Sequence, residues 1–152
     1  MTESPAALSD RAFMDVFLDL VLPPNGGVPG AGALGLSSAV VAGLQSDPLL
    51  GPMVGGALTA VREAALAEHP EGLAGMTPEA GARLVEARLA ANPFVMMGLL
   101  RHLYPAYYAH PDVLRGIGEA ARPPFPEGFE VEATDAGLME KLQARRRVDG
   151  AI

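Results

Sequence analysis

The sequence predicts an all-α protein, a small irregular helical bundle with an extended Pro-rich C-terminal strap. Apolar residues recur at helical spacing in several segments, and nowhere do they alternate convincingly as in a strand. Proline repeatedly follows a capping residue, which is typical of helix starts. With 152 residues, the chain suits a single domain. Within it we expect a helical body over residues 1–121, then the strap and a short C-terminal helix over 122–152.

The first predicted helix begins after Ser9, which is a good N-cap, and ends at Pro23-Pro24. Its apolar positions share one face and comprise Phe13, Val16, Phe17, Leu20 and Val21. The next stretch, residues 24–32, is rich in glycine and proline and predicts a turn-rich loop. We expect helix to resume near Ala33 and to run to Gln45.

Four later helices are predicted from a capping residue that precedes proline. These pairs are Asp47-Pro48, Thr77-Pro78, Asn92-Pro93 and His110-Pro111, of which the last opens a short helix to about Ile117.

Two further prolines predict interruptions. Gly51-Pro52 should break the turn after Asp47, so that a cleaner helix runs from Met53 to about Glu68. Pro105 should kink the helix or make it restart around Tyr104, because proline lacks a donor and clashes one turn back.

Beyond Gly118 the character of the sequence changes. Residues 121–126 read Ala-Arg-Pro-Pro-Phe-Pro, which favours an extended, polyproline-like backbone. A last helix is predicted over residues 137–146.

Composition excludes several classes of function. The formal net charge of −7 argues against nucleic-acid binding, which needs clustered basic residues. Without cysteine, this chain cannot hold a thiolate metal site, an iron–sulfur cluster or covalently attached haem, so any redox cofactor belongs to another chain.

Residues 20–46 carry no charge, but repeated proline and glycine break the run, so we expect no membrane insertion. The first ten residues contain no basic residue ahead of an apolar run, which predicts a cytoplasmic protein.

Candidate catalytic residues are few. His69, His102 and His110 show no metal-ligand spacing, so we expect no metal site. His102 near Tyr104 is a conceivable catalytic residue, although a half-buried helical histidine is the simpler interpretation. The glycines of residues 26–35 lack the strand and the Lys-Ser/Thr ending of a phosphate loop. We therefore expect no catalytic residue and no cofactor in this chain.

Other features indicate a protein partner. Hydrophobic residues make up 49% of the chain and charged residues only 19%, against roughly 25% in typical soluble domains, so part of the surface should be apolar and covered. All three tyrosines, Tyr104, Tyr107 and Tyr108, fall in one window, and tyrosine is favoured at interfaces. We expect them to contact the partner, with core packing as the alternative.

The strap is the second candidate interface. Its expected contact residues are Arg122, Pro123, Pro124, Phe125, Pro126 and Phe129. Prolines pre-set an extended backbone, so little chain entropy is lost when the strap docks, and the two phenylalanines can act as anchors. The alternative is a strap that packs against its own helices.

Several motifs in order resemble the gluconate 2-dehydrogenase subunit 3 family over nearly the whole chain. They are Leu22-Pro23-Pro24, Pro29-Gly30-Ala31, Tyr107-Tyr108 with His110-Pro111-Asp112, and Ala121 to Val131. The resemblance implies a small helical subunit bound to a flavoprotein large subunit of the glucose-methanol-choline type, which holds FAD and oxidises sugars or other alcohols. Exported members often carry a twin-arginine signal and escort the flavoprotein, sometimes with a haem-bearing subunit. This sequence shows no such signal, which argues against export and a cytochrome partner.

Two functions therefore remain. The first is a non-catalytic subunit that stabilises or matures, as a chaperone would, the large subunit of a flavin-dependent dehydrogenase. The alternative is a stand-alone helical binding module for a small apolar ligand.

Overall fold

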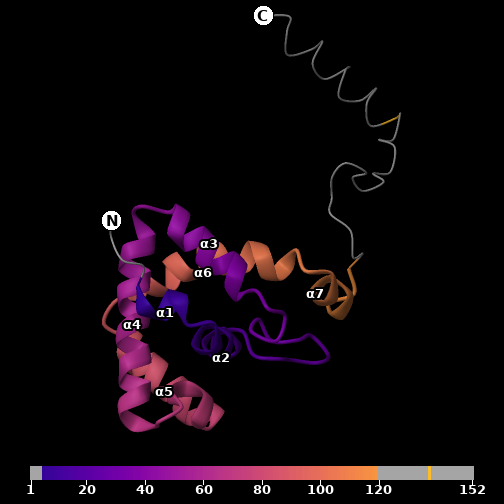
Figure 1. Ribbon diagram of the computed structural model, residues 1–152. Helices are drawn as coiled ribbons and strands as arrows, with labels where there is room; N and C mark the ends of the chain where they lie inside the picture. The colour runs from indigo at the N-terminus through magenta and orange to yellow at the C-terminus, as the bar shows by residue number, and fades with distance from the viewer. Residues whose placement is uncertain (1–4, 120–136, 138–152) are drawn as a thin grey trace, which may run out of the picture. The chain divides into compact units, whose positions relative to one another are not determined.

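The computed structural model describes residues 5–119 and residue 137, and the described part of the chain is all-α (Figure 1). The elements in order are α1 (Ala6–Ser9), α2 (Arg11–Val21), α3 (Ser37–Ser46), α4 (Leu50–Glu68), the 3-10 helix η1 (Gly72–Gly75), α5 (Pro78–Leu89), α6 (Pro93–Tyr108) and α7 (Pro111–Gly116). The predicted fold class is confirmed: over these residues the chain is a small helical bundle without a strand.

The chain divides into two units, residues 1–122 and 123–152. The second unit lies outside the described residues apart from residue 137. The predicted extended strap and the predicted helix over residues 137–146 both fall there.

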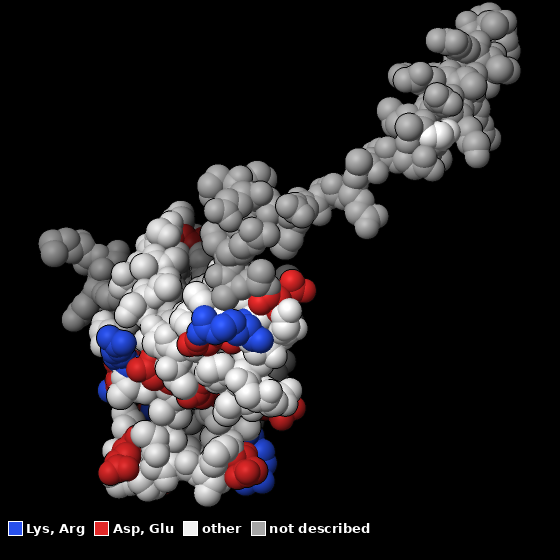
Figure 2. Space-filling view, turned by 90° about the vertical axis from the view of Figure 1, so that its right-hand side faces the viewer, with Lys and Arg blue, Asp and Glu red and all other residues white. Residues whose placement is uncertain are grey.

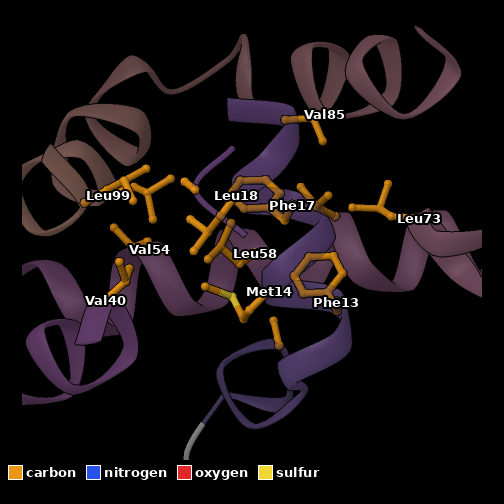
Figure 3. Close-up of a cluster of buried hydrophobic side chains, with 14 of the residues drawn as sticks. Phe13, Met14, Phe17, Leu18, Val40, Val54, Leu58, Leu73, Val85 and Leu99 are labelled. Atoms are coloured by element: carbon orange, nitrogen blue, oxygen red, sulfur yellow. The ribbon is translucent and has the colours of Figure 1, made fainter. Parts of the chain in front are cut away.

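Helix α4 is the central element of the body. It packs against α1, α3, η1, α5 and α6, and Figure 1 shows it running along one side of the bundle. Side chains of α2 fill the space beside it, as Figure 3 shows for Phe17 and Leu18 next to Leu58 and Val54. Each such large apolar side chain contributes about 1.5–3 kcal/mol when it is fully buried, so these contacts are the main stabilisation of the bundle.

The first long helix begins one residue later than the sequence predicts. Asp10, not Ser9, is the N-cap of α2: its Oδ1 accepts a hydrogen bond from the N–H of Phe13 at 3.0 Å. Ser9 instead ends the short helix α1, which the sequence did not predict. Asp10 also pairs through Oδ2 with Nε of Arg62 at 2.7 Å, so one carboxylate both caps α2 and ties it to α4.

The predicted turn-rich loop is confirmed. Asn25 and Val28 exchange two backbone hydrogen bonds of 3.0 and 2.9 Å, and Gly26 and Gly27 between them have φ of 57° and 90°. Two consecutive positive φ values are typical of a type I′ turn, which favours glycine. Helix resumes only at Ser37 rather than near Ala33, because the chain first makes a further turn.

Helix α4 corrects the prediction at Gly51-Pro52. The helix begins at Leu50 and runs through Pro52 to Glu68 without interruption. Pro52 lies in the first turn, where an N–H has no helical acceptor, so its missing donor costs nothing there. The helix also begins two residues later than the pair Asp47-Pro48 predicts, with Leu49 as the N-cap. Asp47 stabilises the preceding turn, since its Oδ1 accepts from the N–H groups of Leu49 at 3.0 Å and Leu50 at 2.9 Å.

The three later helix starts are confirmed. Each capping side chain accepts a hydrogen bond from a first-turn N–H: Thr77 from Ala80 at 3.3 Å, Asn92 from Phe94 at 3.2 Å and His110 from Asp112 at 3.3 Å.

Of the two outcomes predicted at Pro105, a kink or a restart around Tyr104, the restart does not occur. Helix α6 continues through Pro105 to Tyr108. Leu103 and Tyr107, on either side of the proline, are both buried in the core. Their packing keeps the last turn helical although proline removes one backbone hydrogen bond.

The surface of the body carries few charges. Figure 2 shows one face on which small groups of acidic and basic side chains are separated by areas of uncharged residues. Within residues 5–119, no helix is both long and apolar enough to span a bilayer.

Candidate partner-binding surface

Helix α6 is apolar on two sides. Its inner side is buried against the core and consists of Val95, Gly98, Leu99, Leu103 and Tyr107. Gly98 permits close packing, because a Cβ there would lie 2.9 Å from a methyl carbon of Val54 on α4. Core packing therefore accounts for the apolar residues on one side of α6 but not for those on its other side.

The other side is what we call the α6 outer face, and it consists of Phe94, Met97, Arg101, Tyr104 and Tyr108. The spacing of three and four residues places all five on one stripe of the helix. Phe94 and Met97 are each 64% exposed, Tyr104 is 42% exposed and Tyr108 is 50% exposed. Large apolar side chains in a row at this exposure are typical of a surface that another protein covers.

The three tyrosines form one aromatic cluster at the end of the helix. The ring centroids of Tyr104 and Tyr108 lie 5.7 Å apart, those of Tyr107 and Tyr108 lie 5.2 Å apart, and both pairs meet edge to face. This geometry is favourable for aromatic pairs. Such rigid aromatics lose little entropy on binding.

Tyr107 differs from its two neighbours. Its side chain is buried, and its hydroxyl donates a hydrogen bond of 3.0 Å to the carbonyl oxygen of Pro29. Burial, together with the neighbouring Tyr108, raises the pKa of the Tyr107 hydroxyl above its ordinary value of 10.0. Of the three predicted contact tyrosines, only Tyr104 and Tyr108 thus offer exposed surface in the body.

The predicted contact residues of the strap lie outside the described residues. They are Arg122, Pro123, Pro124, Phe125, Pro126 and Phe129.

The glycine-rich loop is organised around a carboxylate of the chain itself. Oδ1 of Asp19 accepts hydrogen bonds from the N–H groups of Gly32 at 2.7 Å and Ala33 at 3.2 Å. A Cβ at Gly32 would overlap the carbonyl oxygen of Asp15, so the close approach of the loop to α2 requires glycine there. Backbone amides that would hold a phosphate in a nucleotide-binding loop here hold Asp19.

Two of the histidines serve as local hydrogen-bond acceptors. Nδ1 of His69 accepts from the N–H of Glu71 at 3.1 Å, and His110 caps α7. Among the described residues, no three potential ligands gather where they would hold a metal ion.

His102 lies between α6, α3 and the start of α4. Its Nε2 is 3.4 Å from Oδ2 of Asp47, but this buried nitrogen makes no hydrogen bond of normal geometry. A Cβ at Gly43 would lie 2.7 Å from Nδ1, so the ring fits against that glycine. The N–H of Leu50 holds the pKa of Asp47 below its ordinary value, so the carboxylate facing the ring is ionised at neutral pH. His102 is thus a largely buried residue of α6.

A groove that the sequence did not reveal adjoins the outer face. It consists of two hollows, of about 640 and about 370 Å³, and Leu20 and Ala82 line both of them. We call it the α2–α5 groove, since these helices form its walls. Tyr104 lines the smaller hollow, so the groove and the α6 outer face share this residue.

A partial signal for the outer face exists in the sequence. Residues 94–100 are apolar around the helix rather than along one stripe, which exceeds what one buried face requires. For the groove we find no such signal, because its walls come from helices whose packing the sequence does not specify.

Comparison of the chain with known protein families, with curated proteins and with solved structures finds no match.

Proposed function

We propose that this chain is a non-catalytic small subunit that binds, and thereby stabilises or matures, a flavin-dependent dehydrogenase large subunit of the glucose-methanol-choline type. The observation that carries the proposal is the α6 outer face, where four large side chains are exposed: Phe94 and Met97 on one side of Arg101, and Tyr104 and Tyr108 on the other. A face of this kind needs a partner, since water solvates it poorly.

The polar chemistry of the body supports a role without catalysis. The amides of the glycine-rich loop are used by Asp19, His69 follows the end of α4, His110 caps α7, and His102 lies between helices. The chemistry and the FAD therefore belong to the partner in this proposal.

The identity of the partner comes from the resemblance to the gluconate 2-dehydrogenase subunit 3 family, whose motifs include Leu22-Pro23-Pro24 and Tyr107-Tyr108. Such a complex oxidises a sugar, a sugar acid or another alcohol. We place it in the cytoplasm.

The test is isolation of the native complex through an affinity tag on this chain. We expect a yellow preparation that contains a FAD-bearing large subunit with alcohol dehydrogenase activity. Met97→Lys, in the middle of the α6 outer face, should reduce its recovery, because a charge there would be buried at the interface. The matched control is Leu66→Lys, since Leu66 is also partly exposed, at 41%, but lies on α4. Isolation of the chain alone, or equal recovery with both variants, would contradict the proposal.

One observation favours the alternative of a small-ligand module. The larger hollow of the α2–α5 groove has a volume of about 640 Å³, within the range of ligand pockets. Size-exclusion chromatography separates the two functions. An unpartnered subunit should self-associate through its apolar face, whereas a ligand module should remain a monomer.

A further inference from the structure

We propose that the α2–α5 groove receives a segment of the large subunit that combines apolar side chains with arginine or lysine. This inference rests on the proposed function and assigns the partner's chemistry at a second surface beside the α6 outer face.

The shape of the groove favours a peptide segment. The two hollows adjoin at Leu20 and Ala82, so together they form one elongated depression along α5. Leu73 and Met76 are among the apolar residues that line the larger hollow, and Met96 and Leu100 are among those that line the smaller one. Two adjoining apolar hollows suit successive side chains of one segment, as in other grooves that bind a helix or an extended peptide.

The charge of the groove selects among such segments. Asp19 and Glu79 line the larger hollow and Glu86 lines the smaller one, whereas no arginine, lysine or histidine lines either. None of these three carboxylates forms an ion pair within residues 5–119. Glu79 and Glu86 lie on one side of α5, which places both along the groove. An apolar lining that includes carboxylates complements a basic, apolar segment and repels an acidic one.

The position of the groove makes one continuous interface. Tyr104 belongs to the α6 outer face and also lines the smaller hollow. A partner that covers the Tyr104 end of the outer face therefore also reaches the groove. The α6 outer face contacts apolar side chains of the partner, and the carboxylates of the groove favour a basic segment over an acidic one.

The first experiment titrates the full-length chain with two synthetic amphipathic peptides, one built of leucine and arginine and the other of leucine and glutamate. We expect only the leucine–arginine peptide to bind. Glu79→Lys with Glu86→Lys should weaken its binding about tenfold, the combined effect of two partly exposed ion pairs. Because an acidic chain attracts any cation, the control is Glu63→Lys with Glu68→Lys, which changes the net charge equally on exposed positions of α4. Equal weakening by both pairs would overturn the inference.

A second pair of variants tests the apolar part of the groove. Ala82→Gln fills the point where the hollows adjoin, and Ala87→Gln makes the same change on α5 outside the groove. We expect Ala82→Gln to abolish binding of the leucine–arginine peptide and Ala87→Gln to leave it unchanged. Both positions are exposed, so circular dichroism should show the same helix content as in the unsubstituted chain.

The last experiment uses the native complex and separates this inference from the proposed function. A benzoylphenylalanine at position 82 should cross-link to a large-subunit peptide that contains arginine or lysine, and one at position 94 should cross-link to the same subunit. Cross-linking from position 94 alone would overturn the groove assignment and leave the proposed function intact. Cross-linking from position 82 to a second copy of this chain would also overturn it. Selective peptide binding at the groove without any isolable flavoprotein would instead support the groove chemistry and refute the proposed function.

Discussion

The hydroxyl of Tyr107 donates a 3.0 Å hydrogen bond to the carbonyl oxygen of Pro29, and this bond joins the end of α6 to the glycine-rich loop. The two residues are far apart in the sequence. The bond therefore fixes the loop against the helix that carries the α6 outer face.

Tyr107→Phe should lower the free energy of unfolding by about 1 kcal/mol, because it removes one partly buried hydrogen bond. Tyr108→Phe is the matched control, since the Tyr108 side chain is 50% exposed, and it should change stability by less than about 0.5 kcal/mol. Urea denaturation measures both values. Equal effects would mean that the bond to Pro29 contributes nothing.

The pKa of Tyr107 predicts an alkaline limit to stability. Burial raises it above the ordinary value of 10.0, so the folded state favours the protonated hydroxyl. The resulting stabilisation is fully present below pH 10.0 and is lost as the pH rises through the higher folded-state pKa. Thermal unfolding at increasing pH should show this loss in the unsubstituted chain and a smaller loss in Tyr107→Phe. Parallel curves would contradict the assignment.

Asp10→Ala should lower the free energy of unfolding by about 1 kcal/mol, and by up to about 2 kcal/mol, as for other lost N-caps. Asp10→Asn should retain most of the capping contribution but lose the ion pair with Arg62.

The pH dependence of Asp10 has the opposite sign. Partial burial by itself raises its pKa, but the N–H of Phe13 and the guanidinium of Arg62 together outweigh burial and bring the pKa below the ordinary 3.8. Stabilisation from the ionised form is therefore present above pH 3.8 and is lost as the pH falls through the lower folded-state value. The stability difference between the unsubstituted chain and Asp10→Asn should shrink over that acid range. A stability difference between the two chains that does not change with pH would contradict the stabilising role of ionised Asp10.

Two glycine substitutions should have opposite effects. At Gly32 a Cβ would overlap the carbonyl oxygen of Asp15, so Gly32→Ala should destabilise the fold by about 1–3 kcal/mol. At Gly56, an exposed position in α4, a Cβ meets no atom within 4 Å, so Gly56→Ala should stabilise it by about 0.5–1 kcal/mol. Thermal denaturation compares them directly. The same sign for both would contradict this account of the loop.

A chain that ends at Ala121 tests the strap predicted from residues 122–131. The buried apolar residues of the described body all lie between Ala7 and Val113, so we expect normal helix content by circular dichroism. Recovery of the large subunit should nevertheless fall, because Phe125 and Phe129 are missing. Retained recovery would refute docking by the strap, and loss of helix content would show that the strap belongs to the core.

The sequence alone determined the fold class and most helix starts. Helical spacing in residues 13–21 and the pairs Thr77-Pro78, Asn92-Pro93 and His110-Pro111 act within one or two turns, so local chemistry is sufficient to predict them. It also predicted the loop, since two glycines between Asn25 and Val28 favour one turn type.

Only the tertiary structure decided the rest. Whether a helix continues through Pro105 depends on the burial of Leu103 and Tyr107 against other helices, which outweighs the local preference of proline. Tyr107 is buried in the core whereas Tyr104 and Tyr108 are exposed, because the packing of α6 on α4 decides which side of the helix faces the core. The groove at Leu20 and Ala82 lies between α2 and α5, and no local sequence pattern predicts that helices so far apart in the chain will pack together.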